Sequence, residues 1–336
     1  MDANLTGEDD DVSVADTPTR RDGSPAIHGL HHVTAIAGDP QRNLDFYVGL
    51  LGLRLVKRTI NFDDPGTYHF YFGDAVGTPG TILTFFSWPA ARRGSRGVGE
   101  VEATAFAIPL ESINYWLERL REHHVAAERL PERFGAQVIR LLDADGMLLE
   151  LVAAESGNEV RPWTEGSVAG EHSIRGFHSV SAAVENHQET ATFLTETFGY
   201  RFVQETGNRF RFAAPGKGVG KIIDLIGRSE SPPGRLGTGS VHHIAFRVLD
   251  EAQQNAWRVK ILELGYDVSP IMDRVYFRSI YFRAPGGVLF EIATDPPGFA
   301  TDENVRELGT SLCLPPWMEG SRPKIEQILP ALSEVG

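Results

Sequence analysis

Apolar residues along the chain follow two alternating periods, one typical of strands and one typical of amphipathic helices. The run LHHVTAI at residues 30–36 reads as a strand and is followed by apolar residues at helical spacing. The same order returns at residues 177–204, where FHSVSAAV precedes a helical stretch and then FGYRFVQE. Two further copies begin with VEATAFAI at 101–108 and VHHIAFRV at 241–248. The chain is therefore predicted to repeat one module four times.

The second and fourth modules are predicted to end in a β-hairpin whose last strand is apolar. The runs DADGMLLELV and APGGVLFEIA both place a Gly-containing turn before a strand that carries one glutamate. Glu150 follows Ala103 by 47 positions (150 − 103), and Glu291 follows His243 by 48 (291 − 243). This agreement indicates a common βαβββ plan, in which a strand and a helix precede a three-stranded meander.

The predicted fold class is α+β. Two such modules side by side close a cup-shaped mixed sheet with helices outside, so four modules are expected to form two cups. The predicted divisions of the chain are a flexible acidic tail at 1–26, modules at 27–92, 98–155, 172–228 and 238–296, and a C-terminal extension at 297–336.

Composition narrows the function classes. The formal net charge of -13 disfavours binding to nucleic acid and to anionic membranes. A single cysteine excludes an intramolecular disulfide and thiolate-rich metal sites, and favours a reducing cytoplasm. No stretch has the roughly 20 apolar residues that cross a bilayer, and the acidic first residues do not resemble a signal peptide. We therefore expect a cytoplasmic protein with a small-molecule partner; a homo-oligomer is left open.

Histidines recur at one position of the module. The equivalent place in the first strand holds His32, Ala103, Ser179 and His243 in chain order. An isolated histidine in an apolar strand is usually a hydrogen-bonded core residue. Two at equivalent repeat positions, with a glutamate at a third, instead indicate a metal site.

The predicted ligands are His32, His243 and Glu291. Two imidazoles and one carboxylate with open positions suit Fe(II) and related divalent ions. Because both histidines must reach one ion at about 2.1 Å, modules one and four are predicted to share a cup. Modules two and three then pair in a cup that is expected to be metal-free. There, Glu150 is interpreted as a capped or solvent-facing carboxylate.

Five further residues are candidates for the surroundings of the site. His31 and His242 precede the ligand histidines, and strand alternation sends them to the opposite face unless a bulge intervenes. They are either core residues or supports for the ligands. Thr34 is predicted to share the face of His32. Arg274 and Tyr281 could orient an anionic substrate oxygen, or be a surface arginine and a packed tyrosine.

The module plan and the His, His, Glu set resemble the vicinal oxygen chelate superfamily, which includes glyoxalase I, extradiol dioxygenases and bleomycin-resistance proteins. More narrowly, the chain from about Ile27 to about Trp317 is similar to dioxygenases that cleave hydroquinones and chlorohydroquinones. The runs that carry this similarity are GLHHVTAIAGDPQRNLDFY, LVKRTINFDDPGTYHFYFGDAVGTPGTILTFF, GNRFRF and PGGVLFEIATDPPGF.

The resemblance implies an Fe(II) enzyme, with Mn(II) as an alternative, that opens a hydroquinone-type or catechol-type ring with O2 in the catabolism of aromatic compounds. It implies metal ligands at His32, His243 and Glu291. The remaining matched positions are catalytic candidates at His242, Tyr281 and Arg274 and pocket residues at His31 and Thr34. An acid, His242 or Tyr281, is expected to assist cleavage of the O–O bond.

Two other functions are known for proteins with this module plan. A glyoxalase-type isomerase or lyase would use Zn, Ni or Co and typically needs a fourth protein ligand. The first module has no glutamate at the end of its last strand, where Phe86 or Ser87 is expected. A non-enzymatic small-molecule-binding protein of the same fold would have no reason to hold a complete ligand set.

Overall fold

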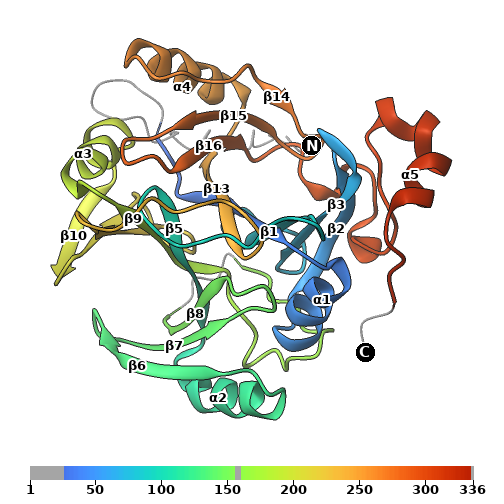
Figure 1. Ribbon diagram of the computed structural model, residues 1–336, viewed down its shortest axis with the longest axis horizontal. Coiled ribbons are helices and arrows are strands. Elements are labelled where there is room, and N and C mark those ends of the chain that lie inside the picture. Colours follow the sequence, from blue (N-terminus) through green and yellow to red (C-terminus); the bar gives the residue numbers. More distant parts are fainter. Residues whose placement is uncertain (1–25, 156–159, 334–336) are drawn as a thin grey trace, which may run out of the picture.

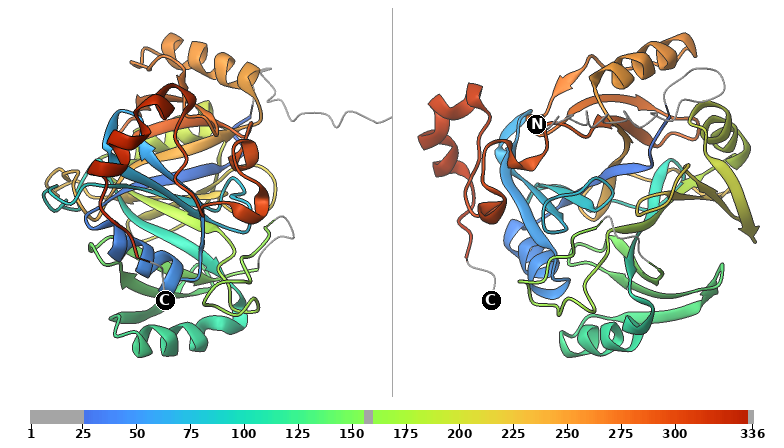
Figure 2. Two further views of the ribbon diagram at one scale, coloured as in Figure 1. Left: turned by 90° about the vertical axis from the view of Figure 1, so that its right-hand side faces the viewer. Right: turned by 180° about the vertical axis from the view of Figure 1, so that it is seen from behind.

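The computed structural model describes residues 26–155 and 160–333, so nearly all of the predicted acidic tail at 1–26 lies outside the described residues. Within these ranges the strands form two curved eight-stranded sheets that lie one above the other, with helices on the outside (Figure 1). Views from the side and from behind show the same two layers and a C-terminal segment against the edge of the first sheet (Figure 2).

The first sheet combines the first and last strand groups of the chain. Its order is β14-β15-β16-β13-β1-β4-β3-β2. The central pair β1 and β13 is antiparallel, whereas β1 with β4 and β13 with β16 are parallel. The strands are β1 (Leu30–Ala37), β2 (Arg54–Asn61), β3 (Asp64–Gly73), β4 (Ile82–Ser87), β13 (Ser240–Val248), β14 (Met272–Asp273), β15 (Arg278–Arg283) and β16 (Leu289–Thr294).

The second sheet repeats this plan with the two middle strand groups. Its order is β10-β11-β12-β9-β5-β8-β7-β6, and its central pair β5 and β9 is again antiparallel. The strands are β5 (Glu100–Ile108), β6 (Ala127–Arg133), β7 (Ala136–Leu142), β8 (Leu148–Ala153), β9 (Phe177–Val184), β10 (Arg201–Thr206), β11 (Arg209–Ala213) and β12 (Ile222–Gly227).

One helical segment follows the first strand of each group and packs on the convex side of its sheet. Helix α2 is amphipathic and buries Ile113, Trp116 and Leu120. The segments are α1 (Pro40–Leu44) with η1 (Asp45–Leu50), η2 (Leu110–Ser112) with α2 (Ile113–Glu122), α3 (His187–Thr192) with η3 (Phe193–Thr197), and α4 (Glu251–Glu263). The C-terminal segment adds η4 (Phe299–Thr301), η5 (Val305–Glu307), η6 (Pro316–Ser321) and α5 (Arg322–Ile328).

The predicted fold class is confirmed. Each group has a strand, a helical segment and a three-stranded meander, and the first group pairs with the fourth and the second with the third. This pairing brings segments more than 200 residues apart into one central antiparallel ladder, in which Thr34 lies opposite His243.

Two β-bulges interrupt that central ladder at the histidine pairs. Leu30 pairs with Phe246 and His32 with Ala245, so His31 is the extra residue on β1. On β13, His243 pairs with Thr34 and Val241 pairs with Ala35, so His242 is the extra residue there. A bulge turns an extra side chain away from strict alternation, so each histidine of a pair can face its neighbour.

The C-terminal segment is attached to the first sheet through a buried lysine. Lys57 on β2 is fully buried, and its Nζ lies 2.5 Å from Oδ1 of Asp302 and also contacts Glu303. The ring of Phe299 packs on Tyr71 of β3, with centroids 5.2 Å apart. The segment therefore supports the first cup from outside.

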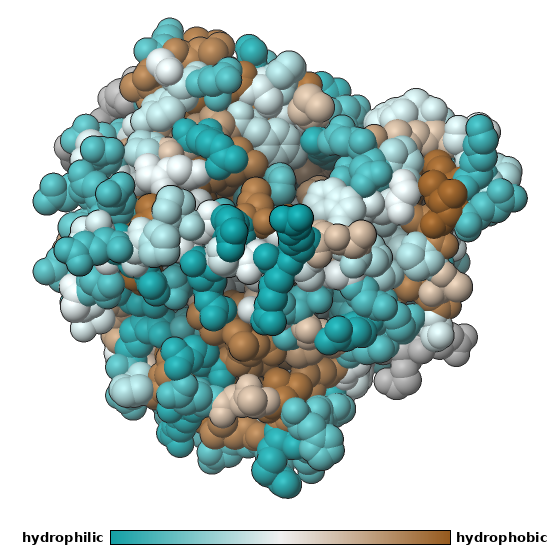
Figure 3. All heavy atoms as spheres, viewed as in Figure 1, coloured by the Kyte–Doolittle hydropathy of each residue, from teal (hydrophilic) through white to brown (hydrophobic). Residues whose placement is uncertain are grey.

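The face of the molecule seen in Figure 3 is mostly hydrophilic, and apolar residues gather in its lower half. No helix within the described ranges is long and apolar enough to cross a membrane.

Candidate metal centre

The three predicted ligands lie together at the centre of the first sheet. Nε2 of His32 and Nε2 of His243 are 3.4 Å apart. Oε2 of Glu291 lies 3.3 Å from the first of these nitrogens and 2.8 Å from the second. All three side chains are buried, with 4% exposure or less. Adjacent strands β1, β13 and β16 supply one ligand each, so the sheet itself sets their spacing.

This triangle fits one divalent ion. Donors at right angles around an ion, each about 2.1 Å from it, are about 3.0 Å from one another. The side chain of Ser279 donates to Oε1 of Glu291 at 2.5 Å, whereas Oε2 receives no well-aligned hydrogen bond despite two nearby ring nitrogens. A buried carboxylate oxygen without such a partner is costly, and an ion between the three atoms would supply the missing interaction.

The charge states of the groups also suit metal binding. Burial alone would raise the pKa of Glu291, but the facing His32 and His243 rings outweigh it and hold the pKa well below its usual range. Burial lowers the pKa of His243 despite the nearby carboxylate. The site therefore offers an ionised carboxylate and a neutral His243 ring, which are the forms that bind metals.

His31 and His242 lie behind the ligand rings. Nδ1 of His31 is 2.9 Å from Nδ1 of His32, and Nδ1 of His242 is 2.8 Å from Nδ1 of His243. Burial lowers the pKa of both outer histidines, to about 3 for His242. Neither is among the residues that line the pocket at the ligands. The bulges thus place their Nδ1 atoms within hydrogen-bond distance of the Nδ1 atoms of His32 and His243.

Thr34, Arg274 and Tyr281 line the pocket beside the ligands. Tyr281 lies directly opposite Glu291 in the β15–β16 ladder. Nε of Arg274 donates to the Tyr281 hydroxyl at 3.3 Å, and Nη1 lies 3.1 Å from Oδ2 of Asp63. Burial raises the pKa of Tyr281, so the phenol keeps its proton. These three side chains bring polar groups of both modules to one cavity.

Sequence reasoning missed the opposite wall of this pocket. His69 and Tyr71 of β3 line it, together with Asn61, Phe62, Phe86 and Phe277. The spacing of His69 and Tyr71 by two residues within a strand was the available signal, because it places both on one face.

The position expected for a fourth ligand is also corrected. In the fourth group, Ala245 stands two residues after His243 and lies opposite Glu291. In the first group, Thr34 stands two residues after His32 and lies opposite Thr84. The equivalent of Glu291 in the first group is therefore Thr84 and not Phe86 or Ser87. The sequence did not define the strand register closely enough to show this.

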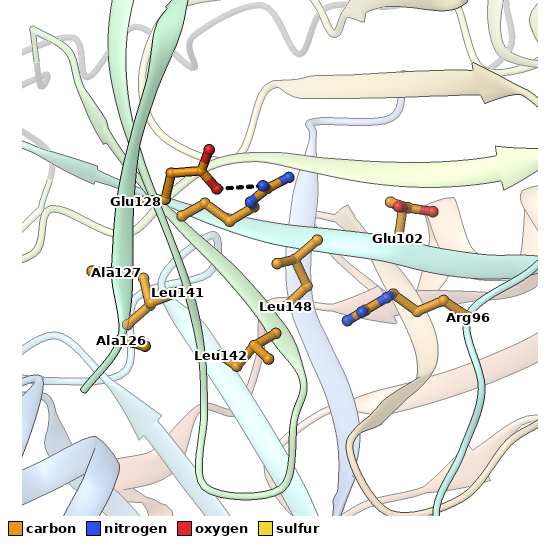
Figure 4. A pocket seen from close by; sticks show the side chains of 9 residues that line it. Arg96, Glu102, Ala126, Ala127, Glu128, Leu141, Leu142 and Leu148 are labelled. Carbon is orange, nitrogen blue, oxygen red and sulfur yellow. Dashed lines mark hydrogen bonds and ion pairs between the residues drawn. The ribbon is translucent and has the colours of Figure 1, made fainter. Parts of the chain in front are cut away.

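The pocket at the ligands is small, with about 30 Å³ of free space, which is room for one or two water-sized ligands. A larger hollow of about 470 Å³ lies over β6–β8 in the second cup. Figure 4 shows its leucine side chains and the ion pair of Glu128 with Arg140. Its lining includes no histidine or cysteine, so it does not resemble a metal site.

The second cup has a different set of side chains at the equivalent positions. Ala103 and Ser179 stand in place of the ligand histidines. Glu150 is buried and accepts two hydrogen bonds from Arg133, at 2.6 and 2.8 Å, in agreement with its interpretation as a capped carboxylate. Asp224 holds the corresponding place in the third group and is paired with two arginines, Arg209 and Arg211. Arginines thus neutralise both carboxylates.

One more cluster of potential ligands comprises Asp302, Glu303 and Cys313. The ammonium group of Lys57 lies among them, 3.8 Å from the sulfur. A cation of the chain itself therefore neutralises this cluster.

The paired modules and the buried triad define a protein of the Glyoxalase/Bleomycin resistance protein/Dioxygenase superfamily. The model of this superfamily matches residues 29–151 and 176–292, and the chain belongs to it. The resemblance inferred from the sequence is therefore confirmed.

Individual relatives are more specific. The chain is 46% identical over 303 residues to a Bacillus subtilis protein named "Putative ring-cleaving dioxygenase MhqO", covering 89% of this chain and 95% of the relative. It is 35% identical over 305 residues to the chlorohydroquinone/hydroquinone 1,2-dioxygenase of Sphingobium indicum, covering 89% of this chain and 95% of the relative.

Solved structures agree on the fold. A crystal structure described as a putative dioxygenase from Bacillus subtilis superposes with a TM-score of 0.88 at 45% identity and covers 92% of this chain and 98% of its own. Glyoxalase I from Zea mays superposes with a TM-score of 0.59 at 14% identity, covering 80% of this chain and 92% of its own, and this match supports the fold alone.

Proposed function

We propose that this protein is an Fe(II)-dependent dioxygenase that opens a hydroquinone-type aromatic ring with O2. The observation that carries the proposal is the buried triad of His32, His243 and Glu291 with Thr84 in place of a fourth ligand. Three protein ligands on one side leave room for two further ligands, a substrate oxygen and dioxygen. The names of the relatives support this reaction class.

When bound, Fe(II) would supply a centre that takes electron density from a coordinated diol and makes it available to dioxygen. The protein would hold this ion with the triad. The outer histidines, His31 and His242, would fix the orientation of the ligand rings, as hydrogen-bonded partners of metal ligands do. Mn(II) accepts the same ligands and stays an alternative.

Of the two acids expected from the sequence, Tyr281 is the better placed. Its ring lies 5.5 Å from that of His243, and it lines the pocket, whereas His242 does not. Arg274 donates to its oxygen, so the phenolic proton can be donated to another oxygen, that of Ser279 or of a substrate. We infer that Tyr281 donates a hydrogen bond to a substrate oxygen and that Arg274 positions it.

Admission of a ring requires the lining side chains to move, because the free space at the ligands is only about 30 Å³. The ion pair of Asp63 with Arg274 spans the β2–β3 and β14–β15 connections of the two modules. Asp63 is 65% exposed, so this contact can open at little cost. We infer that Arg274 moves from Asp63 toward the substrate when the ring binds.

A glyoxalase-type reaction is less well supported. That rival needs a fourth protein ligand, and the neutral Thr84 hydroxyl at the matching position is a weak donor for a divalent ion compared with a carboxylate. A binding protein without catalysis would not account for a buried carboxylate that faces two imidazoles.

The test is anaerobic reconstitution of the full chain with Fe(II), Mn(II) or Zn(II), followed by oxygen-electrode assays with hydroquinones and catechols. We expect stoichiometric oxygen uptake with a hydroquinone and Fe(II). His243→Ala should lose bound metal, while His178→Ala, at a partly buried histidine of the second cup, should retain it. Absence of oxygen uptake with every dihydroxybenzene would refute the dioxygenase, and a His243→Ala variant with full metal content would refute the site.

A further inference from the structure

The two halves of the first cup are related position by position. On β15, Tyr281 lies opposite Glu291, and Ser279 stands two residues before Tyr281 on the same face of the strand. On β3, Tyr71 lies opposite Thr84 in the same way. The ladder therefore makes Tyr71 the counterpart of Tyr281, and His69 the counterpart of Ser279.

Each half also has the same internal hydrogen bond. Ser279 donates to Glu291 at 2.5 Å in the fourth group, and Nε2 of His69 lies 2.9 Å from Oγ1 of Thr84 in the first group. The fourth group thus presents the carboxylate of Glu291. At the matching place the first group presents the neutral side chains of Thr84 and His69.

These neutral groups form a continuous chain of hydrogen bonds. Oγ1 of Thr34 is 2.9 Å from Oγ1 of Thr84, which bonds to Nε2 of His69. Nδ1 of His69 is 3.1 Å from the Tyr71 hydroxyl. Thr34, Thr84 and Tyr71 are at most 1% exposed, and Thr34, His69 and Tyr71 line the pocket. We call this set the Thr34–Tyr71 chain.

We propose that the Thr34–Tyr71 chain is the subsite that binds the second hydroxyl of a 1,4-dihydroxybenzene, the one that does not face the metal ligands. This inference rests on the proposed function and specifies its substrate class. The oxygens of a 1,4-diol lie at opposite ends of the ring, so the distal oxygen needs a polar group on another wall. Both oxygens of a catechol lie side by side.

The hydrogen-bonding capacity of the chain supports this role. A hydroxyl has one donor and two acceptor positions, and a neutral imidazole has one donor and one acceptor. If Nδ1 of His69 carries the proton, it donates to Tyr71, whose own proton is free for a ligand. If Nε2 carries it, the free donor is at Thr34 instead. In either tautomer one end of the chain can donate and the other can accept, as a phenolic hydroxyl requires.

Tyr71 is held firmly in this position. Its ring packs against Phe299 and Tyr276, at centroid distances of 5.2 and 6.0 Å. The hydroxyl therefore has one polar partner in the protein, His69, within the described residues. A fixed hydroxyl with remaining capacity costs little entropy to engage.

The experiment compares binding of hydroquinone and phenol, which lacks the second hydroxyl, by anaerobic calorimetry on the metal-loaded full chain. Loss of a buried hydrogen-bond partner typically weakens binding about tenfold, so the wild-type protein should prefer hydroquinone by about that factor. Tyr71→Phe and His69→Phe should reduce the preference to about twofold or less. His69→Gln, which keeps a donor and an acceptor, should retain most of it.

The metal content and melting temperature of each variant show whether the ligand set and fold persist. His178→Phe is the matched control, because it alters a partly buried histidine of the second cup and should leave the preference unchanged. If His69→Phe does not fold, Tyr71→Phe, which removes one oxygen atom, decides the question. An unchanged preference in Tyr71→Phe, or no preference in the wild-type protein, would overturn the subsite; oxygen uptake by the wild-type enzyme would still support the dioxygenase.

Discussion

The outer nitrogens of the two ligand histidines are bonded to other histidines, whereas many metal-binding histidines donate to a carboxylate or a carbonyl oxygen. A neutral imidazole acceptor orients the ring without adding negative charge to it. Glu291 is therefore the one carboxylate among the three proposed ligands and their two hydrogen-bonded histidines, so a divalent ion held there would keep positive charge with which to attract the oxygen of the proposed diol substrate.

Replacing His242 by alanine should weaken metal binding by about 10- to 100-fold, because the His243 ring loses the partner that orients it. The affinity can be measured by competition with a chromophoric chelator. The same substitution at His178, whose partner is the hydroxyl of Ser179 in the second cup, should leave the affinity unchanged. Equal affinities in the two variants would contradict the orienting role.

The ligands could be predicted from residue identity because His32 and His243 occur at the same place in two copies of one repeat. The sequence does not predict the pocket residues His69, Tyr71 and Thr84 in the same way. Their role depends on which residues of β3 and β4 lie opposite one another, and the eight-residue connection between these strands, 74–81, is too long to specify that register from the sequence. An error of two residues separates Thr84 from Phe86.

At the scale of elements, a carboxylate stands at the same strand position in both cups but faces different side chains. In the first cup a carboxylate faces two imidazoles. In the second cup the carboxylate of β8 faces an arginine of β6, and that of β12 faces an arginine of the adjacent strand β11. The first sheet could be anticipated from its ligands. The arginine pairs could not, because nothing in the sequence shows that Arg133 lies over Glu150.

Arg133→Ala should lower the free energy of unfolding by about 3–5 kcal/mol, because it removes the cation that donates two hydrogen bonds to the buried Glu150. Arg140→Ala removes an ion pair with Glu128 whose side chains are 44% and 60% exposed, and should cost less than about 1 kcal/mol. Urea denaturation of both variants measures the difference. A loss for Arg133→Ala no greater than that for Arg140→Ala would contradict the structural role of the buried pair.

At the scale of the molecule, the pairing of first with fourth module follows from the two histidines that must meet at one ion. The position of the C-terminal segment against β2 and β3 was not predictable in this way, because its contacts depend on a buried lysine. The run LVKRT is strand-like, and Lys57 within it would ordinarily be expected at the surface. Its partners, Asp302 and Glu303, are about 245 residues away.

Lys57→Ala should release the C-terminal segment, because Glu303 is 8% exposed and loses its cation. We expect faster proteolysis between residues 297 and 333 and a loss of about 3–5 kcal/mol in unfolding free energy. Arg121→Ala, at a largely exposed pair with Glu118, serves as the control. Unchanged cleavage in Lys57→Ala would show that the segment is held by its other contacts with the sheet, which include the hydrogen bonds of Thr59 and Arg58 to Cys313 and Thr310.

The central pairing of β1 with β13 also sets the order of events during synthesis. The ribosome makes His32 more than 200 residues before His243 and Glu291, and one imidazole alone holds a divalent ion weakly. A nascent chain therefore lacks the complete set of three proposed ligands until its last module has left the ribosome and joined the first. Under the proposed function, a redox-active ion would thereby be kept away from an unfinished, oxidisable polypeptide, and a prematurely terminated product would lack the site.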